Sequence, residues 1–208
     1  MRVRRVAVFI MLAVGLVVSP TATVGAEAPQ KAPPGFKTVK IKSAGFSIAI
    51  PKDWTILNIT SKNIEKIVDN AREVAPGVVA QLPDIDDLLA QNMVLIALSD
   101  ETSSDFRPNV NVLVQPEVTS PATPEGLLAE IRTIAEPGVG ITLTTIDGED
   151  AVRATYRLDA DAIELQVTQH FVTGARGGLT VTFTGVNGDD SFDEDFDAMA
   201  DSIKLLKR

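Results

Sequence analysis

The chain has 208 residues, of which 45% are hydrophobic and 23% charged, and its formal net charge at pH 7 is −9. This length and composition suffice for one domain with its own hydrophobic core and exclude wholesale disorder. The sequence contains no cysteine, which excludes disulfide bonds, a thiol nucleophile and a thiolate metal site.

Residues 1–26 have the pattern of a cleaved signal peptide. A head with three arginines precedes an unbroken apolar run at residues 6–18, and Val24-Gly25-Ala26 supplies the small residues that a signal peptidase requires. The apolar run is shorter than the roughly 20 residues that a membrane-spanning helix needs. Cleavage after Ala26 removes three arginines and no acid, and it leaves no transmembrane segment.

The predicted location is therefore secreted or extracytoplasmic. The mature chain keeps all 28 acidic residues but only 16 of the 19 basic ones, a net charge of −12. A body this acidic is repelled by nucleic acid and by anionic lipid headgroups, so nucleic-acid binding is not expected. No cysteine follows the signal peptide to carry a lipid anchor.

Residues 27–37 contain three prolines and predict an extended linker, followed by a single domain over 38–208. Apolar and polar residues then alternate at 38–43 and 46–50, which predicts two strands joined by a turn at Ala44-Gly45. Pro51 has no amide hydrogen for a β-ladder, so the second strand ends there or lies at an edge. Trp54 follows closely enough to fold over the end of the sheet.

The middle of the chain predicts helices and strands in alternation. Apolar residues at helical spacing predict a helix over 61–74, and a shorter helical piece is expected within 78–91. Strands are predicted at 93–98 and 110–115. Thr123-Pro124-Glu125 has the cap, proline and acid of a helix start, and Pro137-Gly138 ends that helix.

The second half predicts an antiparallel meander with strands at 141–146, 151–158, 163–172 and 179–186, separated by turns rich in aspartate and glycine. A last helix is expected over 191–206. Its buried stripe consists of Phe192, Phe196, Met199, Ile203 and Leu206. The order of these elements predicts an α+β fold.

This order, together with three groups of residues, resembles the superfamily of PsbP, the Ran-binding protein Mog and exported DcrB-like proteins. The residues are Gly45-Phe46-Ser47-Ile48-Ala49-Ile50-Pro51-Lys52-Asp53-Trp54, then Gly148-Glu149-Asp150-Ala151-Val152-Arg153-Ala154-Thr155-Tyr156, and finally Phe196 with Ser202-Ile203-Lys204. The best match is to exported actinobacterial LpqN-like proteins, although this chain lacks the lipidated cysteine that many of them carry.

The resemblance covers residues 38–208 and implies an antiparallel β-sheet flanked by helices on both faces. It also implies an accessory or binding role, because members of the superfamily do unrelated things and share no catalytic motif. A shared fold does not by itself assign a function.

Two residues, Trp54 and His170, are candidate contacts for a ligand or partner. His170 is the only histidine, and strand alternation places it beside Gln166 and Thr168, on the face opposite Val167. Without a second histidine or a cysteine it is more simply interpreted as a partly exposed strand residue. Trp54 is likewise best interpreted as an aromatic residue in the core or at its rim. The alternative is that Trp54 lines a ligand-binding groove.

Other motifs have simpler structural explanations. The acidic residues between 189 and 197 lack the spacing of a calcium-binding loop, so a solvated helix start explains them. Gly174-Ala175-Arg176-Gly177-Gly178 joins two strands and predicts a hairpin turn rather than a phosphate-binding loop. No Gly-x-Ser-x-Gly motif of a serine hydrolase occurs.

The sequence therefore predicts no catalytic, cofactor-binding or metal site. We expect an exported, non-catalytic binding or accessory protein that acts on a protein or cell-envelope partner. The alternative is a carrier of a small apolar ligand in a groove between sheet and helix, which the many apolar faces and an aromatic content of 5% suggest.

Overall fold

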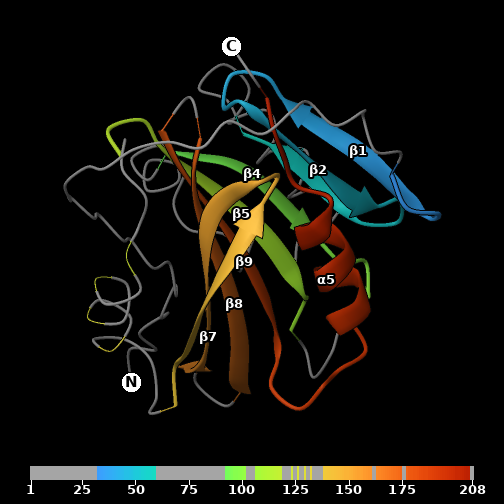
Figure 1. The fold of residues 1–208 in the computed structure, drawn as a ribbon. Coiled ribbons are helices and arrows are strands. Elements are labelled where there is room, and N and C mark those ends of the chain that lie inside the picture. The colour runs from blue at the N-terminus through green and yellow to red at the C-terminus, as the bar shows by residue number, and fades with distance from the viewer. Residues whose placement is uncertain are drawn as a thin grey trace, which may run out of the picture.

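The computed structural model shows a protein built mainly of antiparallel strands (Figure 1). It describes residues 32–59, 92–101, 106–118, 138–160, 163–174 and 177–206, together with residues 123, 126, 129 and 132.

The smaller of two sheets brings together the two ends of the described domain. Strands β1 (Phe36–Ile41) and β2 (Phe46–Pro51) form a hairpin, and β10 (Lys204–Leu205) pairs with the other edge of β2. Gly45 has a φ of 76° in the turn, a conformation that glycine adopts without strain. Strand β2 is buried along its whole length, and it ends at Pro51 as predicted.

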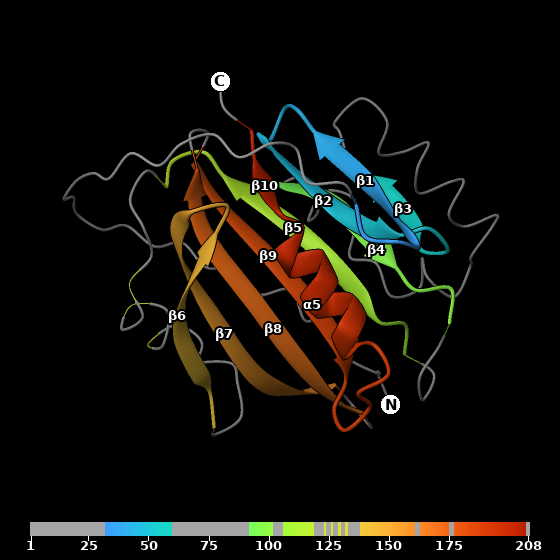
Figure 2. The same cartoon turned by 45° about the vertical axis from the view of Figure 1, so that its right-hand side comes forward.

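The larger sheet has seven strands in the order β3-β4-β5-β9-β8-β7-β6, and all neighbours are antiparallel. Figure 2 shows these strands side by side. Their bounds are β3 Thr55–Asn58, β4 Met93–Leu98, β5 Asn109–Gln115, β6 Gly140–Ile146, β7 Glu149–Ala160, β8 Ile163–Gly174 and β9 Gly177–Val186.

The predicted strands of the second half are confirmed as β6, β7, β8 and β9. The turns between them have the residues that hairpins require. Asp147 and Gly148 both have positive φ, 53° and 83°, as a two-residue turn between β6 and β7 demands. The glycine-rich segment after β8 likewise joins two paired strands, so it is a hairpin connection as expected.

Helix α5 (Asp193–Asp201) lies across the large sheet in front of β5 and β9, while β6, β7 and β8 lie to one side of it (Figure 2). Met199 is fully buried beneath the helix. Phe192 and Phe196, at the N-terminal end of the helix, are partly buried and pack against the core. The predicted apolar stripe is therefore confirmed for Phe192, Phe196 and Met199, but Ile203 and Leu206 lie beyond the helix, which is shorter than the expected 191–206. The chain leaves the helix at Ser202 and continues as β10.

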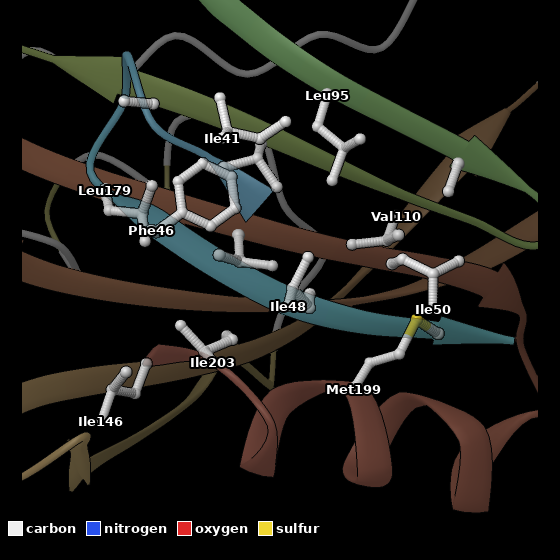
Figure 3. Packing of buried hydrophobic residues seen from close by; sticks show 14 of the residues in the cluster. Ile41, Phe46, Ile48, Ile50, Leu95, Val110, Ile146, Leu179, Met199 and Ile203 are labelled. Atoms are coloured by element: carbon white, nitrogen blue, oxygen red, sulfur yellow. The ribbon is translucent and has the colours of Figure 1, made fainter. Parts of the chain in front are cut away.

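The main core lies between the two sheets and α5. In Figure 3 the side chains of Phe46, Ile48 and Ile50 extend from β2 among side chains of the large sheet, with Met199 beside them. Each of these four is 0% exposed. Complete burial of such a side chain contributes about 1.5–3 kcal/mol to folding, so this strand is a main source of stability.

The predicted arrangement of helices on both faces of one sheet is wrong. The described residues form two antiparallel sheets with one helix, and the small sheet together with α5 covers one face of the large sheet. The physical reason is that β2 is buried along its whole length, Ser47 included, and pairs on both edges, which makes it the centre of a second sheet rather than an outer hairpin. No helix in the described part of the chain is long and apolar enough to span a membrane.

Several expected elements lie outside the described residues: the signal peptide at 1–26, the helix at 61–74 and the helical piece within 78–91. Most of the helix expected between Thr123 and Pro137 also lies outside the described residues. Within that region, the amide of Gly126 donates a hydrogen bond to Thr123 Oγ1 at 3.2 Å, the bond that an N-cap threonine accepts.

Candidate functional site

A groove with a volume of about 340 Å³ lies where the exposed half of the large sheet meets the start of α5. Its floor is one face of β7, β8 and β9. Strand register places Arg153 opposite His170, Thr168 opposite Phe183, and Gln166 opposite Gly185. All six of these residues line the groove, because every second residue of a strand faces the same side.

The wall of the groove is acidic. It is formed by the loop from Asn187 to Asp190 and by Asp193, Phe196 and Asp197 of α5. The loop is anchored to the sheet, since the amide of Asn187 donates to Glu164 O at 2.8 Å. Asp189 Oδ1 accepts hydrogen bonds from the amide and the hydroxyl of Ser191, at 3.1 and 2.6 Å.

Aromatic rings support the corner between wall and floor. The rings of Phe183 and Phe196 lie 5.4 Å apart between centroids. Phe196 also lies over Gly185, where an added Cβ would come 3.4 Å from Phe196 Cε2. Below them Trp54 contacts Phe196 edge to face at 6.2 Å. Phe183 and Phe196 line the groove, whereas Trp54 is not among its lining residues.

His170 is buried at the edge of this corner. It is 8% exposed, and its ring meets Phe183 edge to face with centroids 5.8 Å apart. Its Nδ1 has no hydrogen-bond partner among the described residues. The pKa of His170 is lowered from 6.5 to about 4, mainly by burial and also by the positive charge of Arg153, while Asp197 opposes the shift. The imidazole is therefore neutral at pH 7.

Among the described lining residues, Arg153 is the one positive side chain beside the acidic wall. Arg153 Nη2 lies 3.9 Å from Asp197 Oδ1, and both side chains are largely exposed. Partial burial and the nearby carboxylates of Asp190 and Asp197 raise the pKa of Asp193. With His170 neutral, the groove carries four carboxylates against one guanidinium.

The described lining residues include no serine or cysteine, and Nδ1 of His170 is not held by an acid in the way a catalytic triad requires. Among the described residues, no three potential metal-ligating side chains come together.

The structure separates the two candidate contacts named from the sequence. His170 faces the groove together with Gln166 and Thr168, as strand alternation predicted, but it is buried rather than partly exposed. Trp54 is a core residue with 3% exposure. That either residue contacts a ligand or partner stays a prediction.

Sequence reasoning did not find Arg153 or the two phenylalanines as groove residues. They come together only through the pairing of β7, β8 and β9 and the packing of α5. The signal that was available is alternation, which places Arg153 with Thr155 on the more polar face of its strand, as it places His170 with Thr168. The acidic cluster is divided: Asp193 and Asp197 line the groove, while Glu194 and Asp195 do not.

No protein-family model matches the sequence, and no curated protein matches it. Solved structures similar in fold include the PsbP protein CyanoP of Synechocystis sp. PCC 6803, with 11% identity and a TM-score of 0.48 over 87% of this chain and 98% of that chain. LpqN of Mycobacterium tuberculosis, involved there in cell envelope biogenesis, has 13% identity and a TM-score of 0.46 over 83% and 91%.

A Bacteroides thetaiotaomicron protein has 11% identity and a TM-score of 0.48, covering 79% of this chain and 46% of that chain, so this chain spans less than half its length. The chain is thus similar in structure to PsbP and LpqN, the proteins that its sequence motifs resemble. At these identities the likeness concerns fold alone and assigns no function.

Proposed function

We propose that the protein is an exported, non-catalytic binding protein, and that the groove beside α5 is where it contacts a protein or cell-envelope partner. The observation that supports this most is the combination of an open acidic wall, an aromatic corner and a buried histidine in one hollow of about 340 Å³. Ligand pockets commonly begin at about 300 Å³ and combine apolar surface with a few polar groups.

The compartment belongs to the same proposal. The basic and apolar pattern of residues 1–26 supports export, with a linker from residue 27 that ends where β1 begins at Phe36, and the rest of the chain as the binding domain. LpqN, which is similar in fold, is involved in cell envelope biogenesis, but the proposal does not rest on that likeness.

The groove does not favour the alternative of an apolar ligand. Phe183, Val186 and Phe196 are its large apolar lining residues, and most of the remaining lining is charged or polar. An apolar ligand placed there would remove carboxylates from water without giving them a partner, which is unfavourable.

Affinity capture with two matched baits tests the proposed function. One bait carries Asp193→Asn and Asp197→Asn in the groove, and the other carries Glu194→Gln and Asp195→Asn on the same helix outside it. We expect the second bait and the wild type to retain the same partner from native secretions and envelope extracts, and the first to lose it. Equal retention by both baits, or no partner for any, would contradict the proposal.

A further inference from the structure

We propose that the groove binds the ammonium group of a lysine-type side chain or of a small alkylamine, with Asp193 and Asp197 as its counter-charges. This inference rests on the function proposed above and names the ligand chemistry of the same site. Four aspartates line the groove, and among its described lining residues Arg153 is the one cation. An additional cation therefore meets an excess of negative charge.

Stabilisation of the helix start does not account for all of this charge. Asp193 lies in the first turn of α5, where the partial positive charge of the helix N-terminus favours an acid. Asp197 lies one turn further on. The two are four residues apart on one face, where like charges destabilise a helix, and both line the groove. A cation between them removes that repulsion.

His170 gives an independent indication of a ligand. Its side chain lines the groove, is more than nine-tenths buried, and leaves Nδ1 without a hydrogen-bond partner in the described part of the chain. Buried polar nitrogens are nearly always paired. A neutral imidazole with its proton on Nε2 has an acceptor at Nδ1, and an N–H donor of a ligand would pair it.

The lining favours an organic cation over a metal ion. No set of three potential metal ligands is present among the described residues. Phe196 and Val186 instead place apolar surface beside the carboxylates. The methylene stem of a lysine packs on such surface while its charged end remains near water and acids. A bare ion gains nothing from these side chains.

Amide NMR shifts of the 15N-labelled mature chain test the proposal directly. The probes are butylammonium, Nα-acetyl-lysine amide and the neutral Nα,Nε-diacetyl-lysine amide. We expect saturable shifts at Gly185, Gly188 and Asp193 with both cations and none with the neutral compound. Tighter binding of the lysine amide points to a protein side chain, and tighter binding of butylammonium points to a free amine. Equal binding of the neutral compound overturns the proposal.

Variants separate a local site from general charge. Asp193→Asn with Asp197→Asn should weaken binding of the lysine amide by about tenfold or more, and Arg153→Gln should tighten it by about threefold because a competing cation is gone. Glu194→Gln with Asp195→Asn changes the net charge equally and should stay within about twofold of the wild type. Equal weakening by both double variants overturns the proposal.

The test also distinguishes this inference from the proposed function. If neither cation binds, yet partner capture still depends on Asp193 and Asp197, the ligand assignment is wrong and the binding function stands. If capture is also independent of these two residues, both are wrong.

Discussion

His170 is buried between Phe183 and the charges of Arg153 and Asp197, and this position makes stability depend on pH. Above pH 6.5 the imidazole is neutral in both the folded and the unfolded chain. Between pH 6.5 and about 4 the unfolded chain binds a proton that the folded chain does not, so stability falls as the pH falls. The raised pKa of Asp193 acts in the opposite direction, because protonation relieves both the cost of its partial burial and its repulsion by Asp190 and Asp197.

We therefore expect the free energy of unfolding of the wild type, relative to His170→Gln, to fall by on the order of 3 kcal/mol between pH 7 and pH 4. Urea denaturation at a series of pH values measures it. Because the chain has one histidine, the imidazole proton signal in NMR also reports the folded-state pKa without assignment. A folded-state pKa near 6.5, or a difference between the two proteins that is constant with pH, would contradict this account.

Tyr156 lies on the opposite face of the large sheet, 2% exposed, and its hydroxyl has no partner among the described residues. Burial raises the pKa of this phenol. Removing an unpaired buried hydroxyl removes a desolvation penalty, so Tyr156→Phe should leave stability unchanged or raise it by up to about 1 kcal/mol.

The control for Tyr156→Phe is a hydroxyl on the same face of the sheet that has a hydrogen-bond partner. Thr182 Oγ1 accepts a hydrogen bond from Gln169 Nε2 at 3.0 Å. Thr182→Val should therefore destabilise the protein by about 1–2 kcal/mol in the same denaturation assay. If Tyr156→Phe is as destabilising as Thr182→Val, the hydroxyl of Tyr156 has a partner after all.

At the scale of elements, the end of α5 shows why the sequence predicted too long a helix. The apolar spacing of Met199 and Ile203 continues through the helix end, so periodicity alone gives no stop signal. What ends the helix is not local: Ser202 Oγ accepts a hydrogen bond from the amide of Ala49, 153 residues away, at 2.7 Å. The next residues then pair with β2.

Ser202 therefore joins helix α5 to strand β2, since its hydroxyl also donates to Met199 O at 2.6 Å. Ser202→Ala leaves the buried amide of Ala49 unpaired and should lower the free energy of unfolding by about 1–2 kcal/mol in urea denaturation. Ser191→Ala, near the other end of the helix, removes only the exposed hydrogen bond from the hydroxyl to Asp189 and should change the free energy of unfolding by less than about 0.5 kcal/mol. Equal effects of the two substitutions would show that Ser202 does not join these elements.

At the scale of the whole molecule, the strands were predictable and their assembly was not. Alternation and turn residues identify most strands of the meander, because each depends on neighbours in sequence. The second sheet depends on β10 meeting β2 across the length of the domain, which no local pattern reports. Trp54 and β2 supply core for that second sheet.

The candidate site follows the same rule. The face of His170 was predictable from its neighbours on β8, but its burial was not, because Phe183 comes from another strand. Arg153 becomes part of the site through cross-strand register and its ion pair with α5. A lone histidine and an acidic helix start, each unremarkable in sequence, become one site only in the folded chain.

Photo-crosslinking in the native host tests most directly whether this groove is the binding surface. Benzoylphenylalanine placed at Asp190, an exposed residue of the acidic wall, is compared with the same residue at Leu143. Leu143 is 74% exposed and lies on β6, opposite Val152, whose side chain belongs to the other face of the large sheet. We predict a discrete crosslinked partner from position 190 and none from position 143. The same adduct from both positions, or an adduct from position 143 alone, would contradict the account.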